Sequence, residues 1–288
     1  MASSFMLLFF ILLSRLCHCR TKDWLVTDLN DFPKAKLNRD CDYNGFECIE
    51  LSNSLISRKF IISPNFFTVE YNSFLTSHQE YALRSPFSPE AIIGFDHHNY
   101  SIGGVSYINN TNTTAAFWDP SFLKTENIAI DDDTFIFESH SISSSLYKVY
   151  DWTPGTRGSL TYIPWPPKGL QLNVTFKPPI SAPENIRKSI TVTVQYEMYQ
   201  GMPLLSKRVF IESSAPSLTS DVLLTYVQVE QLKTNIPYGV GEKDWDWGDV
   251  DTPMVPFPGQ LWIELDVPKV GVPLLLISII NSFYYFFC

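Results

Sequence analysis

Short runs of β-branched and aromatic residues, separated by turn residues, recur along the chain from Phe46 onward. The clearest run is Ser189–Tyr199, where apolar and polar side chains alternate from end to end. Such alternation gives an antiparallel strand one buried apolar face and one polar face. Gly201, Met202 and Pro203 then predict a turn into a second strand, so the two strands should form a hairpin. The same pattern predicts strands at Phe46–Ser52, Leu55–Ile62, Thr68–Asn72, Ala91–Phe95, Thr134–Ser139, Leu170–Phe176, Leu204–Ile211, Leu223–Val229 and Gln260–Leu265.

This strand pattern determines the predicted fold class. No amphipathic helical pattern longer than about two turns is present, and 20 prolines among short apolar runs disfavour long helices. Many short strands without intervening helices are typical of an antiparallel sandwich rather than a parallel α/β sheet. With 288 residues, 45% of them hydrophobic, the chain can bury a sizeable core. We therefore predict an all-β, antiparallel β-sandwich with few or no long helices over residues 46–266.

The first residues have the pattern of a secretory signal. An apolar core covers Phe5–Leu13, and the small residues Cys17 and Cys19 fit the −3 and −1 positions of a cleavage site before Arg20. The apolar core is too short to span a bilayer comfortably, although an uncleaved anchor is the alternative interpretation. We therefore expect residues 1–19 to be a signal peptide, residues 20–45 to be a polar leader, and the protein to be extracellular or in the secretory pathway.

Asparagines in the Asn-x-Ser/Thr pattern agree with secretion. A polar stretch that ends near Thr114 holds three of these sequons and predicts an exposed loop. Each sequon is a candidate site of N-glycosylation. The candidate asparagines are Asn99, Asn109, Asn112 and Asn173.

Removal of the signal leaves the cysteines Cys41, Cys48 and Cys288. Cys41 and Cys48 flank a short turn, and in an oxidising compartment they are expected to form a disulfide. A metal site is the rival interpretation, but no second Cys or His pair lies at zinc spacing, so we predict no metal. Cys288 is left as an odd cysteine.

The charge balance excludes some classes of partner. The net charge is −9 and the isoelectric point is near 5.0. Non-specific nucleic-acid binding and binding to anionic membranes both require clustered Lys and Arg. We therefore expect no nucleic-acid partner, and a membrane association only if the C-terminal segment is an anchor signal.

A Pro- and Gly-rich stretch is the first candidate binding region. It holds Trp152, Arg157 and Trp165, and its composition predicts a rigid aromatic loop. Two indoles with a guanidinium fork suit stacking and hydrogen bonding against a sugar. The alternative is a structural loop whose tryptophans cover the edge of the sandwich.

An acidic and aromatic stretch, Gly241–Asp251, is the second candidate. Its spacing does not match a calcium-binding EF-hand, because Gly248 stands where the third carboxylate should be. A contact with a sugar or a partner, a cation site, glycosidic acid/base chemistry and a solvated loop all remain open. The candidate carbohydrate contacts in this stretch are Asp244, Trp245, Asp246 and Trp247.

No complete catalytic constellation is present. His97 and His98 are adjacent, so on a strand they point to opposite faces and rarely share a metal. The chain has neither a nucleophile-elbow motif nor a phosphate-binding Gly-rich loop. We predict no catalytic residue and no cofactor.

The segment Ile49–Phe60, with several later segments, carries a resemblance to a known family. It resembles the opening strands of the N-terminal β-sandwich of α-galactosidase-type, melibiase-like glycoside hydrolases, although Ser54 stands where the family has Gly. The resemblance would cover about residues 46–266 and implies a galactose-mutarotase-like supersandwich. The other segments that resemble the family are Ser88–Ala91, Tyr100–Gly104, Trp152–Gly158 and Trp165–Leu170.

The resemblance also implies what is missing. In that family the sandwich precedes a (β/α)₈ barrel that supplies both catalytic aspartates, and this chain ends where such a barrel would begin. The implied function is a secreted, non-catalytic sandwich that contacts an α-galactoside-like carbohydrate or the missing barrel and is inactive alone. The alternative is a cell-surface module that binds protein. A third hypothesis is an intact hydrolase that uses Glu242, Asp244 or Asp246.

The C-terminal segment, residues 267–288, is an apolar run. It fits three interpretations. It can be a glycosylphosphatidylinositol-type or tail anchor, a buried first strand of a parallel barrel, or an apolar extension that replaces the true continuation.

Overall fold

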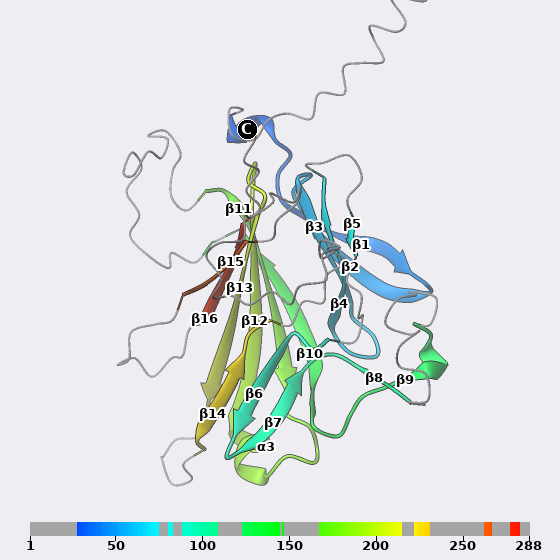
Figure 1. Cartoon of the computed structure of the whole chain (residues 1–288), viewed down its shortest axis with the longest axis vertical. Helices are drawn as coiled ribbons and strands as arrows, with labels where there is room; N and C mark the ends of the chain where they lie inside the picture. Colours follow the sequence, from blue (N-terminus) through cyan, green and yellow to red (C-terminus); the bar gives the residue numbers. More distant parts are fainter. Residues whose placement is uncertain are drawn as a thin grey trace, which may run out of the picture.

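The computed structural model describes residues 28–74, 80–82, 88–108, 123–144, 146, 167–214, 222–230, 262–266 and 277–282. Within these residues the chain is an all-β structure of mostly antiparallel sheets, as the sequence predicts. Figure 1 shows a smaller sheet beside a larger one.

The smaller sheet is a meander in which each strand pairs with the next one along the chain. The first hairpin turns at Asn44 and Gly45, whose φ angles of 53° and 83° are both positive. Two positive φ angles match the right-handed twist of the flanking strands, so an Asn-Gly pair favours this turn. The strands are β1 (Lys36–Tyr43), β2 (Phe46–Ser52), β3 (Ile56–Ile61), β4 (Phe67–Ser73) and β5 (Glu80–Ala82).

The larger sheet has the strand order β14-β6-β7-β10-β11-β12-β13-β16-β15. Its pairs are antiparallel except for β7 and β10, which run parallel. A two-stranded sheet joins β8 (Ser106–Tyr107) to β9 (Ile128–Ala129). The strands of the larger sheet are β6 (Ala91–Phe95), β7 (His98–Ile102), β10 (Thr134–Ser143), β11 (Gly169–Lys177), β12 (Ile190–Tyr199), β13 (Leu204–Ser213), β14 (Leu224–Gln228), β15 (Trp262–Asp266) and β16 (Ile277–Ser282).

Helices are short throughout the described part of the chain. The α-helix α3 (Glu184–Ser189) precedes β12, and the 3₁₀ turns η1 (Leu29–Asp31) and η4 (Thr125–Asn127) are each a single turn. Among the described residues, no helix has the length and apolar character needed to cross a membrane.

The main core lies between the two sheets. Alternate residues of β2 and β3, together with Tyr71 of β4, share one buried cluster with alternate residues of β11 and β12. The ring of Phe60 on β3 lies 4.9 Å from the ring of Tyr196 on β12, centroid to centroid. Period-2 alternation therefore presents the apolar face of each sheet to the other, as a sandwich requires.

Two buried asparagines fasten the sheets to each other. Asn53 follows β2, and its Nδ2 donates to the carbonyl oxygens of Tyr199 and Met202 at 2.6 Å each. Asn65 precedes β4, and its Nδ2 donates to the carbonyl oxygens of Gly104 at 3.1 Å and Phe135 at 3.3 Å. Each asparagine also accepts backbone N–H groups of its own loop or of β10. A carboxamide can satisfy both roles because it carries donors and an acceptor.

The strand predictions agree closely with the structure. β2 and β6 have the predicted bounds, and the other predicted strands differ by a few residues at their ends. The hairpin of β12 and β13 pairs as the turn at residues 201–203 indicates. Ser189, the first residue of the predicted strand, is instead the last residue of the helix α3, and β12 begins at Ile190.

β7 and β8 lie in the polar stretch from Asn99 to Thr114, which the sequence predicts to be an exposed loop, and Tyr100 and Ile102 are buried there. Two further strands lie in segments that the sequence assigns to other roles. β1 (Lys36–Tyr43) belongs to the segment 20–45, predicted to be a leader, yet it pairs with β2. The sheet therefore begins before Phe46. β1 has no buried residue because it is an edge strand, and an edge strand rich in charged residues lacks the apolar alternation of a core strand.

The second such strand is β16, in the C-terminal segment 267–288. It pairs antiparallel with β13 and with β15. This pairing differs from the parallel barrel strand that one interpretation of the segment predicts. The sequence alone could not distinguish the two, because a continuous apolar run carries no information about its partner.

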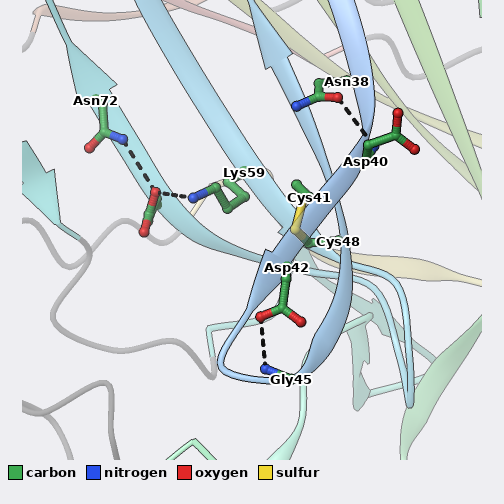
Figure 2. The surroundings of a disulfide bond; sticks show 9 residues. Asn38, Asp40, Cys41, Asp42, Gly45, Cys48, Lys59 and Asn72 are labelled. Atoms are coloured by element: carbon green, nitrogen blue, oxygen red, sulfur yellow. Dashed lines mark hydrogen bonds and ion pairs between the residues drawn. A yellow bond between two sulfur atoms is a disulfide. The ribbon is translucent and has the colours of Figure 1, made fainter.

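The predicted disulfide joins β1 to β2. Cys41 and Cys48 are directly opposite in the register, and their Cα atoms lie 5.4 Å apart. Figure 2 shows the bridge beside the turn, where Asp42 Oδ1 accepts the N–H of Gly45 at 3.0 Å. A ring of this size stabilises the folded chain by about 2.5 kcal/mol in the loop-entropy model.

The turn between β2 and β3 leads to a first prediction. Ser54 has a φ of 70°, in the left-handed region, and its side chain is exposed. That conformation costs an L-residue about 1–2 kcal/mol, while Gly loses about 0.5–1 kcal/mol of extra backbone entropy. Ser54→Gly is therefore expected to raise the free energy of unfolding by about 0.5–1 kcal/mol.

Urea denaturation measures this change as a higher midpoint with an unchanged slope. Ser54→Ala is the matched control, because alanine has the same left-handed cost as serine and should not stabilise the protein. A midpoint for Ser54→Gly at or below that of Ser54→Ala would contradict the prediction.

Candidate functional site

The predicted carbohydrate contacts lie outside the described residues. They are Trp152, Arg157, Trp165, Asp244, Trp245, Asp246 and Trp247, and they stay predictions. The sequons Asn109 and Asn112 also lie outside, whereas Asn99 and Asn173 are described. Asn99 is exposed on β7, and Asn173 is half-buried in the middle of β11.

Two polar clusters are present instead, one on each face of β12 and β13. The first is the core ionic cluster, which lies between the two sheets. Glu90 immediately precedes β6, and Glu230 follows β14. The members of the core ionic cluster are Arg58, Glu90, Tyr196, Lys207 and Glu230.

Arg58 is fully buried on β3 and connects both carboxylates of the cluster. Its Nη1 donates to Glu230 at 2.7 Å, and its Nη2 donates to Glu90 at 3.1 Å. Its Nε donates to the hydroxyl of Thr68 at 2.8 Å. The guanidinium carbon also lies 5.0 Å from the ring centroid of Tyr196, within cation–π range. Arg58 is therefore held by the neighbouring strand, by both acids and by the facing sheet.

Lys207 is the second cation and comes from β13. Its Nζ lies 3.0 Å from Glu90 Oε2 and 3.1 Å from Glu230 Oε1, and it donates to the Glu90 carbonyl oxygen at 2.5 Å. Glu90 also accepts the N–H and the hydroxyl of Thr68 at 2.6 and 2.7 Å, together with the hydroxyl of Tyr196. Two cations thus face two carboxylates. Their ion pairs and hydrogen bonds compensate the free-energy cost of removing these four charges from water.

The electrostatics of the cluster follow from this arrangement. Burial alone would raise the pKa of Glu90, but Lys207 and Arg58, with hydrogen bonds from Tyr196 and Thr68, lower it to about 2. Burial opposes the charge of Arg58, yet Glu230 and its other neighbours raise the pKa of Arg58 above its usual value. Burial and Glu90 raise the pKa of Tyr196, so its hydroxyl keeps the proton that it donates. The cluster is a charged cross-link between strands and its members are almost completely buried.

The second cluster is the outer polar face of the larger sheet. The register aligns its residues in rows across β10, β11, β12 and β13. One row is Ser141, Asn173, Gln195 and Arg208, and the adjacent row is Ser143, Gln171, Glu197 and Ser206. The third row begins with Ser139, Thr175 and Thr193. These named residues together define the outer polar face, which is opposite the side that packs on the smaller sheet.

A chain of hydrogen bonds crosses this face from a buried ion pair to a half-buried amide. Arg208 Nη1 lies 2.9 Å from Glu197 Oε2 and donates to Gln195 Oε1 at 2.8 Å. Gln195 Nε2 in turn donates to Asn173 Oδ1 at 2.9 Å, and Gln171 Nε2 donates to the same oxygen at 3.1 Å. Because Oδ1 of Asn173 accepts both of these hydrogen bonds, it is turned toward the network. The Nδ2 group of Asn173 is then the donor that remains for a ligand.

Burial changes steadily across the face. Glu197 and Arg208 are 0% and 1% exposed, Gln171 and Asn173 are half-buried, and Ser141 is exposed. Burial and Glu197 raise the pKa of Tyr199, which follows in β12, so its hydroxyl remains protonated and donates to Glu197 at 2.9 Å. The ion pair therefore anchors the network at its buried end, while amides and hydroxyls form its accessible end.

The accessible end has a defined chemical character. It offers carboxamide and hydroxyl groups. Among its named residues the charges are the paired Glu197 and Arg208, and Lys177, the next residue after Thr175 on this side of β11, pairs with Glu138. Such a surface has donors and acceptors but no net charge, so it matches an uncharged polyhydroxylated ligand better than an anion or a cation. Among the described residues, no group of His, Cys, Asp and Glu is placed to hold a metal ion.

Comparisons of the chain with protein-family models, with curated proteins and with solved structures find no match. The chemistry of the outer polar face is therefore the basis for a functional proposal.

Sequence reasoning identified neither cluster, although signals for both were present. Arg58 and Lys207 occupy the apolar register of their strands, between Ile56 and Phe60 and between Leu205 and Val209. A cation in such a position is buried only when it is paired. The alternation in β12 predicts one buried apolar face and one polar face, whereas Gln195 and Glu197 on the polar face are also buried.

Proposed function

We propose that this protein is a secreted, non-catalytic β-sandwich that binds carbohydrate through the outer polar face. The all-β sandwich agrees with the fold implied by the resemblance to the N-terminal region of α-galactosidase-like glycoside hydrolases. That resemblance suggests an α-galactoside-like ligand. It also suggests that catalysis needs a barrel beyond this chain.

One observation carries the proposal, namely the ordered row of polar groups on β11 and β12. The Glu197–Arg208 pair orients Gln195, and Gln195 with Gln171 orients Asn173. Amides fixed in this way lose little conformational entropy when a ligand binds, which favours affinity for a small polar molecule.

Gln171→Ala tests the proposal directly. The protein is made without N-linked glycans and screened against immobilised α-galactosides and other glycans, and calorimetry then measures the dissociation constant. We expect Gln171→Ala to weaken binding at least tenfold, because it removes a donor of the face and loosens Asn173. A tenfold loss corresponds to about 1.4 kcal/mol.

Gln228→Ala is the matched control. Gln228 is also half-buried in the larger sheet and accepts a hydrogen bond from Tyr226 at 3.1 Å, but it lies on β14. Its replacement should leave sugar binding unchanged. Absence of binding by the native protein, or equal binding by native protein and Gln171→Ala, would reject the proposed site. Capture of a protein partner without any glycan would favour the alternative of a protein-interaction module.

A further inference from the structure

We propose that Asn173 carries an N-linked glycan whose first sugars occupy the outer polar face, so that glycosylation closes this face to other ligands. The proposal rests on the proposed function for the identity of the competing ligand. It rests independently on the sequon Asn173-Val174-Thr175 and on the placement of its asparagine.

The first observation is where the sequon lies. Asn173 is in the middle of β11, paired with Ser141 of β10 on one side and with Gln195 of β12 on the other. Directly opposite side chains in adjacent strands are about 5 Å apart. Any group attached to Asn173 is therefore in contact with the centre of the outer polar face.

The second observation is the orientation of the amide. Oδ1 accepts from Gln171 and Gln195, so it is turned into the network. Nδ2, the atom to which an N-linked glycan is joined, donates no hydrogen bond within the described structure. An N-linked amide keeps its oxygen and one N–H, so modification leaves both of the observed hydrogen bonds intact.

The third observation is the room beside this nitrogen. The neighbouring strand β10 presents Ser139, Ser141 and Ser143 on this face, and the first two are exposed. Serine is a small side chain with a hydroxyl that both donates and accepts. The surface toward β10 can therefore accommodate a sugar ring and hydrogen-bond to it.

The modification itself is a glycosyl transfer from a polyprenyl-pyrophosphate-linked oligosaccharide. The amide nitrogen of Asn173 forms a bond to the anomeric carbon, and the bond from that carbon to the pyrophosphate oxygen breaks. Polyprenyl pyrophosphate leaves with the bonding electron pair, and the amide releases one proton. Because β11 is flanked on both sides in the folded sheet, the transfer must precede strand pairing.

The consequence is an intramolecular ligand. A tethered group is present at an effective concentration in the millimolar range near its attachment point. Its hydroxyls then use the same amides and serines as a free sugar. Asn99 offers a contrast, because it is exposed on β7, away from the outer polar face, and opposite Gly94, which has no side chain.

The test uses the full chain secreted from a glycosylating eukaryotic host. Glycopeptide mass spectrometry measures occupancy at each asparagine, and peptide N-glycosidase is applied before and after denaturation. We expect Asn173 to be occupied and its glycan to be released only after denaturation, while a glycan on Asn99 is released from the native protein. Calorimetry then compares the native chain from this host with the native chain made without N-linked glycans, so that no residue of the outer polar face is replaced. Ser101→Ala, which removes the Asn99 sequon on β7, is the control for a glycan elsewhere.

The native chain made without N-linked glycans should bind the sugar at least tenfold more tightly than the glycosylated native chain or glycosylated Ser101→Ala. An unmodified Asn173 would overturn the inference, and so would a glycan released as readily as that of Asn99. Equal sugar binding by the modified and unmodified forms would also overturn it. If no form binds sugar while the Asn173 glycan is protected, the glycan occupies the face as inferred and the proposed recognition of free sugar is wrong.

Discussion

Replacing Glu90 by Gln is expected to lower the free energy of unfolding by about 3–5 kcal/mol. Glu90 accepts from Arg58, Lys207, Tyr196 and Thr68 within a fully buried site. Gln has the same shape, but its NH₂ group would face donors where a charged oxygen now accepts. The two cations would also keep only one carboxylate between them. Urea denaturation of native protein and Glu90→Gln measures the difference.

Glu184→Gln is the control for this substitution. Glu184 pairs with Lys188 one helical turn away, but both side chains are largely exposed. An exposed pair of this kind contributes little to stability, so we expect no measurable change. Equal effects of Glu90→Gln and Glu184→Gln would show that the core ionic cluster does not cross-link the sheets.

The pH dependence of stability gives a second measurement on the same residue. The pKa of Glu90 is about 2 in the folded protein, below its ordinary value of 4.5. The ionised carboxylate therefore stabilises the fold above pH 4.5, and this contribution is lost as the pH falls towards 2. The shift corresponds to about 3 kcal/mol. Native protein should lose this amount across that window, whereas Glu90→Gln should lose correspondingly less.

Coupling within the cluster is the last check on its role. Lys207→Met removes a cation that Glu90 and Glu230 now share. Each single variant leaves a buried charge with too few partners, whereas the double variant removes one charge of each sign. The double variant Glu90→Gln/Lys207→Met should therefore be less destabilised than the sum of the single variants, by about 0.5–3 kcal/mol.

Asn65→Asp is expected to destabilise the protein by a similar amount, about 3–5 kcal/mol. Asn65 is fully buried, and its Nδ2 lies 3.1 and 3.3 Å from the carbonyl oxygens of Gly104 and Phe135. Aspartate would place a charged oxygen against two acceptors with no cation beside it. A buried, unpaired charge is among the most destabilising changes that a single substitution can make.

Asn38→Asp is the matched control, since it makes the same change in net charge on the edge strand β1. There Asn38 Oδ1 accepts the N–H of Asp40 at 3.1 Å, which a carboxylate can also do. The effect should stay within about 0.5 kcal/mol. The defect of Asn65→Asp should also shrink as the pH falls towards about 4, because burial without a cation raises the pKa of the new carboxyl, and the protonated carboxyl can donate to one carbonyl. A pH-independent defect would contradict this explanation.

Several features of the structure could be predicted because they depend on neighbours in sequence. Alternation in Ser189–Tyr199 and the turn at residues 201–203 predicted the hairpin of β12 and β13, since period-2 patterning and turn chemistry are local. The short spacing of Cys41 and Cys48 likewise predicted their disulfide.

The tertiary structure decided which polar residues belong together. Arg58, Glu90, Lys207 and Glu230 are far apart in sequence and meet only because β3, β6, β13 and β14 converge on one core. The outer polar face likewise depends on the register that aligns Asn173 with Gln195 and Arg208. The composition of the chain and its alternation of apolar and polar residues determined that strands form, because the polarity of each side chain favours its burial or its exposure. The order and register of the strands decided which charged residues form ion pairs. An ion pair needs its two charged groups close together, and only the folded chain brings residues distant in sequence that close.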